Sequence, residues 1–225
     1  MQHLPCMNES AMPLSPSTDT SQTTRRISCA ACLRPRITCI CQWITPVANE
    51  VEVLILQHPA EVHQAKGSAR LLHLSLRSNC LVIGETFEEK QLHMLMHGPA
   101  DNPAHAVLLY PPTPGMFASH VFEPDALVKP QRLRLIVLDA TWRKSLKMLH
   151  CNPLLQALPR VLLDEAPPSA YRIRKTRHAH QLSTLEAACH ALAQLERNAH
   201  RYRPLLAGFD GFVMQQLTYR NLRAN

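Results

Sequence analysis

The feature of this chain that most constrains its fold is a series of short aliphatic runs separated by amphipathic segments. The runs are rich in Val, Ile and Leu, and they occupy residues 51–57, 80–84, 106–110, 133–138 and 160–163. Uninterrupted runs of this length are typical of parallel strands buried on both faces. The segment between the first two runs carries apolar residues at helical spacing, namely Val62, Ala65, Ala69, Leu72 and Leu76. We therefore predict an α/β domain with a mostly parallel sheet and helices on both faces.

Two more helices are predicted after the last aliphatic run. The first is "LSTLEAACHALAQLERNAH", whose apolar stripe is formed by Leu182, Leu185, Cys189, Leu192 and Leu195. Ser183 or Thr184, together with Glu186, is expected to cap its start. The final segment, from Pro204 to Leu222, is expected to form a closing helix that Gly211 interrupts.

Length and charge limit the organisation and the partners of the chain. Its 225 residues suit one domain with a small appendage, and 24 Lys and Arg against 17 Asp and Glu give a net charge of +7. A basic excess favours an anionic partner such as nucleic acid, although a surface that is merely basic gives the same count. No apolar run approaches the roughly 18–20 residues that span a bilayer. We expect a cytoplasmic protein with no membrane association.

The N-terminal part divides into a tail and a cysteine-rich motif. Residues 1–26 are rich in Ser, Thr, Pro and Met and are expected to be disordered. Residues 27–45 contain Cys29, Cys32, Cys39 and Cys41 in a C-x2-C-x6-C-x-C pattern. Two close thiolate pairs joined by a short loop can supply the ligands of a tetrahedral structural zinc site. An iron–sulfur cluster or redox chemistry remains an alternative.

The remaining cysteines and the glycines also carry information. Cys80 and Cys189 lie in apolar periodic segments and are interpreted as small core residues, reduced in a cytoplasmic setting. The chain has six glycines and contains neither G-x-G-x-x-G nor G-x-x-x-x-G-K-[ST]. A dinucleotide-binding turn of the Rossmann type and a P-loop are therefore unsupported.

The run 133–138 stops at an acidic residue, which marks a possible site. Asp139 follows this run, and Trp142 and several cations come directly after it. In open α/β sheets, ligands bind beyond the carboxyl ends of the strands. The alternatives are that Asp139 only caps the next helix, that Trp142 is a packing residue, and that the cations form a solvated helix face. These cations are Arg143, Lys144 and Lys147.

Several spaced motifs resemble one known family. "DATW", from Asp139 to Trp142, is similar to the D-x-T-W signature of the DTW-domain family. The cysteine motif, "HPAE", "LLYPP", "YRIRK" and "LSTLEAACHAL" occur around it in the family's order. The resemblance covers the chain from about Cys29 to the C-terminus. Within this region, residues 46–225, which follow the cysteine motif, are interpreted as the DTW domain. It is closest to the bacterial tRNA-uridine aminocarboxypropyltransferases.

This resemblance implies a fold and an activity that periodicity does not show. The fold would be SPOUT-like, with a C-terminal knotted cofactor site. The activity would be transfer of the 3-amino-3-carboxypropyl group of S-adenosylmethionine to N3 of a uridine in tRNA, with release of methylthioadenosine. The alternatives are a SPOUT-type RNA methyltransferase and a non-catalytic, zinc-bearing RNA-binding module. No obligate protein partner is implied.

The resemblance also implies roles for individual residues. Asp139 would be the catalytic residue, either as a proton acceptor or as a group that holds the uracil edge. The S-adenosylmethionine pocket would be formed by Leu109, Tyr110, Pro111, Thr141, Trp142, Ser183, Thr184 and Glu186. The tRNA backbone would be bound by Arg143, Lys144, Arg172, Arg174, Lys175 and Arg177.

Overall fold

A five-stranded parallel sheet lies at the centre of the computed structural model, which describes residues 27–111, 121–123, 129–163 and 182–222. The strand order is β2-β1-β4-β3-β5, and every neighbouring pair is parallel. The strands are β1 (Glu52–Gln57), β2 (Asn79–Ile83), β3 (His105–Leu109), β4 (Leu133–Asp139) and β5 (Arg160–Val161). The predicted parallel sheet is thus confirmed, and each strand lies at one of the five aliphatic runs.

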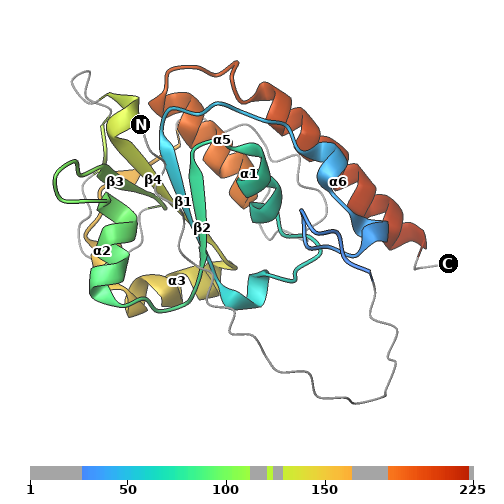
Figure 1. The fold of residues 1–225 in the computed structure, drawn as a ribbon, viewed down its shortest axis with the longest axis horizontal. Coiled ribbons are helices and arrows are strands. Elements are labelled where there is room, and N and C mark those ends of the chain that lie inside the picture. Colours follow the sequence, from blue (N-terminus) through green and yellow to red (C-terminus); the bar gives the residue numbers. More distant parts are fainter. Residues whose placement is uncertain (1–26, 112–120, 124–128, 164–181, 223–225) are drawn as a thin grey trace, which may run out of the picture.

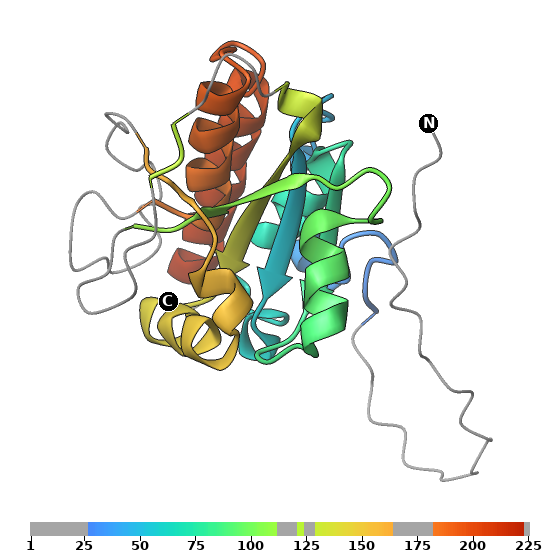
Figure 2. The ribbon, with the colours of Figure 1, turned by 90° about the vertical axis from the view of Figure 1, so that its left-hand side faces the viewer.

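Helices cover both faces of the sheet, as the sequence predicts (Figure 1). The α-helices are α1 (Ala69–Ser75), α2 (Glu89–His97), α3 (Trp142–Cys151), α4 (Pro153–Gln156), α5 (Thr184–Leu195) and α6 (Arg203–Leu222). Short 3-10 helices are η1 (Arg36–Thr38), η2 (Cys41–Trp43), η3 (Pro59–Glu61) and η4 (Pro130–Arg132). Figure 2 shows α5 and α6 on one side of the strands and α2 on the other.

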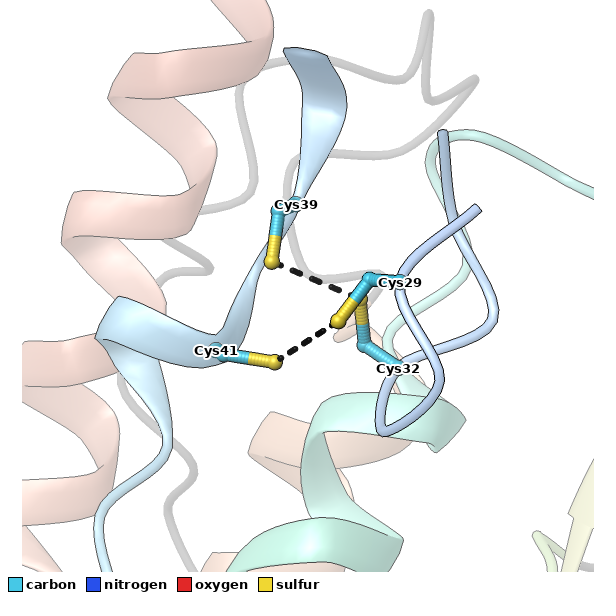
Figure 3. Close-up of side chains that lie close together, drawn as sticks. All are labelled: Cys29, Cys32, Cys39 and Cys41. Carbon is cyan, nitrogen blue, oxygen red and sulfur yellow. Dashed lines mark hydrogen bonds between the residues drawn. The ribbon is translucent and has the colours of Figure 1, made fainter. Parts of the chain in front are cut away.

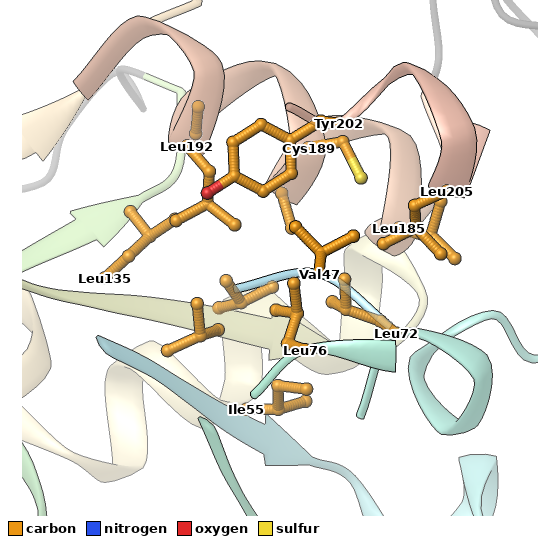
Figure 4. Packing of buried hydrophobic residues seen from close by; sticks show 14 of the residues in the cluster. Val47, Ile55, Leu72, Leu76, Leu135, Leu185, Cys189, Leu192, Tyr202 and Leu205 are labelled. Carbon is orange, nitrogen blue, oxygen red and sulfur yellow. The ribbon is translucent and has the colours of Figure 1, made fainter. Parts of the chain in front are cut away.

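The two faces of the sheet bury separate apolar clusters, because side chains alternate along a strand. On β4, Leu135 and Val137 face the cluster under α1, α5 and α6, whereas Ile136 belongs to the cluster under α2, α3 and α4. The first cluster includes Leu185, Cys189 and Leu192 of the stripe that the sequence assigned to the helix α5 (Figure 4). Leu182, the first residue of the predicted stripe, precedes α5 and is only partly buried. Strands buried on both faces need apolar residues at every position, which is why the runs are continuous.

Three details differ from the sequence interpretation. The amphipathic segment from Val62 is helical only from Ala69, because Gly67 and the turns before it separate α1 from η3. Cys80 on β2 is disulfide-bonded, not a free core thiol, whereas Cys189 is free and buried. The third difference is that α6 runs without a break through Gly211.

The expectations that fall on other segments stay predictions. The tail 1–26 lies outside the described residues, as does the segment 164–181 that precedes α5 and bears on the expected SPOUT-like knot. Across the helices that the structure describes, none combines the length and the apolar character needed to cross a membrane.

Gly211 is required by packing between α6 and the N-terminal motif. A Cβ placed on Gly211 would lie 2.1 Å from Cζ3 of Trp43, far inside van der Waals contact. Trp43 is further held by a hydrogen bond of 2.7 Å from its Nε1 to Oε1 of Gln215. The glycine therefore serves close approach of a rigid indole and does not mark a helix end.

We predict that Gly211→Ala lowers the free energy of unfolding by about 1–3 kcal/mol, because the added methyl overlaps the indole. In a Trp43→Leu background the same change should be neutral or stabilising by up to about 1 kcal/mol, since alanine has the higher helix propensity. Urea denaturation of the four proteins of this double-mutant cycle measures both values. An equal effect in the two backgrounds would contradict the packing explanation.

Candidate functional site

The carboxyl ends of β1 and β4 bring a buried polar pair together. Gln57 and Asp139 are Cα partners in the parallel register and are the last residues of their strands. Both are almost fully buried, at 6% exposure each. Nε2 of Gln57 donates a hydrogen bond of 2.8 Å to Oδ2 of Asp139. By strand alternation, Asp139 shares the face of Leu135 and Val137, toward α5.

The N-terminus of α5 completes the surroundings of Asp139. Oγ1 of Thr184 donates a hydrogen bond of 2.7 Å to Oδ1 of Asp139. The helix starts at this point because Ser183 and Glu186 form a capping box, as the sequence predicted. Its position is fixed further by Ser68, whose Oγ accepts the backbone N–H of Leu185. Each carboxylate oxygen of Asp139 thus has a donor, which stabilises the charged form in a buried setting.

This geometry answers whether Asp139 caps the following helix. The N-cap position of α3 is occupied by Thr141 and not by Asp139. Asp139 is the last residue of β4, and its carboxylate is directed to Gln57 and to Thr184. The interpretation of Asp139 as the cap of the following helix is therefore wrong. Its buried carboxylate must have a different role.

At the same edge of the sheet, the residue that follows β3 and the first residue of α3 stack on each other. Tyr110 belongs to the cluster under α2, α3 and α4, whereas Asp139 faces α5. The rings of Tyr110 and Trp142 are nearly parallel, with centroids 5.2 Å apart and 9° between their planes. The guanidinium of Arg160 lies over the Tyr110 ring, 5.7 Å from its centroid. Tyr110 and Arg160 are buried, whereas Trp142 is 50% exposed. The stack therefore begins in the core and ends at the surface.

Hydrogen bonds fix the orientation of this stack. Oγ of Ser145 donates to the backbone carbonyl of Trp142 at 2.9 Å. Because the Ser145 proton is used there, the hydroxyl of Tyr110 is the donor in the 3.1 Å contact with Ser145 Oγ. Burial raises the pKa of Tyr110, which keeps this donor protonated.

Two ion-pair groups tie α3 to the loops that follow β1 and β2. Lys144 pairs at 2.8 Å with Glu61, whose side chain is only 4% exposed. Lys147 and His58 both reach Glu85, each at 2.9 Å. His58 Nδ1 accepts the amide of Ala60, so Nε2 carries the proton donated to Glu85. Hydrogen bonds from Lys147 and then His58 lower the pKa of Glu85. Lys144 is thus partly engaged and is not on a purely solvated face.

The predicted site residues are only partly brought together by the described chain. The structure places Leu109, Tyr110, Pro111, Thr141, Trp142, Ser183, Thr184 and Glu186 on β3, α3 and α5 or on the residues next to these elements. Arg143 is exposed on the first turn of α3. The remaining predicted tRNA contacts, Arg172, Arg174, Lys175 and Arg177, lie outside the described residues.

Sequence reasoning missed Gln57, Ser145 and Arg160 as parts of this neighbourhood. Gln57 ends the run 51–57, and a polar residue at the end of a buried strand is a signal of the same kind as Asp139. Arg160 opened another run and was treated only as part of a strand. Ser145 carried no signal, because its role depends on the tertiary position of Tyr110.

The four cysteines of the N-terminal motif form a compact cluster (Figure 3). All four Sγ atoms lie within 4.8 Å of one another. The Cys29–Cys41 pair is separated by 3.6 Å and the Cys32–Cys39 pair by 3.7 Å. A tetrahedral site with Zn–S bonds of about 2.3 Å requires sulfur separations of about 3.8 Å. The cluster therefore fits the dimensions of a tetrathiolate metal site.

Backbone groups around the cluster shape it for thiolate ligands. The tight loop of Cys29 to Arg34 is closed by the hydrogen bond from the Cys29 amide to the Arg34 carbonyl, with Leu33 at a positive φ of 60°. The backbone amides of Cys32 and then Ala31 donate to the Cys29 sulfur and lower its pKa to about 6. Burial raises the pKa of Cys41 to about 12. Metal binding must therefore displace protons from some of the thiols.

The cysteine motif is fastened to the rest of the domain. Arg34 donates to the carbonyls of Ala65 and Gly67 at 2.5 and 2.8 Å. Gln215 of α6 donates to the Cys39 carbonyl at 3.0 Å. Cys32 and Ile40 belong to the same buried cluster as α5 and α6. A metal held by the four thiols would thus stabilise the attachment of the motif to α1 and α6.

We predict that the protein, purified without added metal, contains about one zinc ion per chain. Cys39→Ser should lower the zinc content and the melting temperature, because it removes one of the four ligands. Cys151→Ser is the matched control, since Cys151 is a free thiol outside the cluster. Metal analysis and thermal denaturation give the two readouts. Stoichiometric iron, or full stability in metal-free protein, would contradict the zinc assignment.

Comparisons with known proteins agree with the motif order of the chain. The chain is 33% identical over 197 residues to tRNA-uridine aminocarboxypropyltransferase 2 of Drosophila melanogaster, covering 86% of this chain and 76% of that protein. It is 32% identical over 201 residues to the Mus musculus protein of the same name, covering 87% of this chain and 65% of that protein. A tRNA-uridine aminocarboxypropyltransferase A of Arabidopsis thaliana is 27% identical over 160 residues, covering 66% of this chain and 59% of that protein. No solved structure matches.

These relatives come from animals and a plant, and they leave the expected closeness to bacterial members untested. The chain spans about three quarters of the fly protein and just under two thirds of the mouse protein. A model of one protein family, the DTW domain, matches residues 26–217, which include the cysteine motif, Asp139, α5 and most of α6. The chain therefore belongs to the DTW domain family.

Proposed function

We propose that this protein transfers the 3-amino-3-carboxypropyl group of S-adenosylmethionine to N3 of a uridine in tRNA, releasing methylthioadenosine. The observation that carries the proposal is the family match across the whole candidate site, together with relatives named for this activity. The net charge of +7 supports an RNA substrate. A cytoplasmic location remains part of the proposal.

The S-adenosylmethionine pocket is proposed at the carboxyl edge of the sheet, where α/β folds bind ligands. The residues that would line it are Leu109, Tyr110, Pro111, Thr141, Trp142, Ser183, Thr184 and Glu186. Ser183 and Glu186 bond each other's backbone amides in the capping box, so they would contribute mainly by shaping the backbone at the start of α5. When bound, S-adenosylmethionine supplies a sulfonium that makes the adjacent carbon chain electrophilic.

Asp139 is the proposed catalytic residue. The uridine N3 loses its proton during attack, and a fixed carboxylate beside it can accept that proton or hold the uracil edge in line. Gln57 and Thr184 each use one carboxylate oxygen of Asp139.

The tRNA backbone is proposed to pass over the N-terminus of α3. Arg143 is exposed there, and Lys144 is partly exposed while it pairs with Glu61. We propose that Arg172, Arg174, Lys175 and Arg177 add phosphate contacts from the segment before α5. Such contacts position the RNA and carry no base specificity of their own.

Product analysis separates this proposal from the two alternatives. Protein incubated with S-adenosylmethionine and unmodified tRNA should release methylthioadenosine and add the aminocarboxypropyl mass to uridine. S-adenosylhomocysteine with a methylated nucleoside would show a methyltransferase instead. Neither product, with tRNA binding retained, would show a non-catalytic RNA-binding module.

We predict that Asp139→Asn lowers the single-turnover transfer rate about 10²- to 10⁴-fold while the fold is retained. The asparagine carbonyl can still accept from Gln57, and its amide can donate to the Thr184 hydroxyl, so only the carboxylate charge is lost. Thr184→Val is the matched comparison, because it removes one donor and keeps the carboxylate. Rapid-quench assays and melting temperatures of both variants test this. Near-normal transfer by Asp139→Asn would defeat the catalytic role.

A further inference from the structure

The exposed Trp142 is held in a way that a mere packing residue does not need. Its ring stacks on the buried Tyr110. The Ser145 hydroxyl donates to the backbone carbonyl of Trp142 and is also hydrogen-bonded to the Tyr110 hydroxyl. Tyr110 in turn lies under the Arg160 guanidinium. The indole is thus fixed from below by buried groups, while half of its surface remains exposed.

Such an arrangement suits a ligand with a flat apolar face. An exposed indole leaves a large apolar area in water, and covering that area with an aromatic partner is favourable. Because the side chain is already oriented, little conformational entropy is lost when a partner stacks on it. Single-stranded RNA bases stack on aromatic side chains in this way, and stacking tolerates any base.

The position of Trp142 favours an RNA base over a small cofactor. Small-ligand pockets cover most of their ligand, whereas Trp142 lies at the rim between the exposed Thr141 and Arg143. Arg143 offers a cation for the phosphate beside a stacked nucleotide. Asp139 lies three residues earlier, at the end of β4, so Trp142 and the proposed catalytic residue are at the same edge of the sheet.

We propose that the outward face of the Trp142 indole is a stacking platform for a nucleobase of the tRNA, either the target uracil or its neighbour. The inference rests on the proposed function for the identity of the RNA. It assigns the outward face of the indole to RNA, since the inner face is stacked on Tyr110. Extruding the target base costs stacking within the RNA, and a stacking platform on the enzyme offsets part of that cost.

Equilibrium binding of an unmodified tRNA transcript, and separately of S-adenosylmethionine, tests this platform. Trp142→Leu keeps apolar bulk but removes the aromatic face, and it should raise the Kd for tRNA about 5- to 150-fold. Trp142→Phe keeps an aromatic face and should recover most of the affinity. The Kd for S-adenosylmethionine should rise by a smaller factor than the Kd for tRNA, because Trp142 is one of eight residues proposed to line that pocket. Met94→Ala on α2, another exposed apolar position, is the control and should change neither affinity.

The outcomes that overturn the proposal are distinct. A loss of S-adenosylmethionine affinity at least as large as the loss of tRNA affinity would place the adenine of the cofactor on Trp142. Unchanged affinity for both ligands would make the indole an exposed packing residue only. Both binding measurements are made without turnover, so they are independent of the product analysis. A wild-type protein that binds tRNA but forms no methylthioadenosine would refute the proposed function. The comparison of binding between variants would remain valid in that case.

Discussion

The buried carboxylate of Asp139 is the interaction on which the arrangement of the candidate site depends. A charge with so little exposure persists only where donors surround it, and here the donors come from β1 and from α5. These two elements are far apart in sequence, but the parallel register and the capping box bring them to one point. The same contacts that make the charge tolerable therefore also align the strand end and the helix start between which a ligand would bind.

Paired charges help to hold the loops around this point. Glu61 follows β1 and forms an ion pair with Lys144 of α3. Glu85 follows β2 and forms an ion pair with Lys147 of the same helix. The pair with the buried Glu61 is the more consequential one, because an unpaired carboxylate at 4% exposure would be costly, whereas the more exposed Lys147–Glu85 pair is screened by solvent. The N-terminal turn of α3, which carries Trp142, is thereby kept against the sheet edge.

Most of the fold could be predicted from the sequence because local pattern and tertiary environment agree. Strands buried on both faces leave continuous aliphatic runs, and α5 has both its apolar stripe and its capping residues. The predictions failed where the role of a residue depends on a contact with a residue far away in the sequence. Gly211 was interpreted as a helix break because its reason, the Trp43 indole, lies far away in the chain. The pairing of Gln57 with Asp139 depends on the register of β1 against β4, which neither run specifies. The aromatic stack likewise requires the side-by-side placement of β3 and α3.

The attachment of the cysteine motif to α6 has a consequence for the order of events during synthesis. Gln215 forms hydrogen bonds with Trp43 and Cys39, and Tyr219 with the carbonyl of Ile37, so α6 holds the cysteine motif. Contacts between such distant segments form late, because the whole intervening chain must be made and positioned first. The hydrogen bonds from α6 to Trp43, Cys39 and Ile37 therefore cannot form until α6 has been synthesised, so the cysteine motif gains this attachment last.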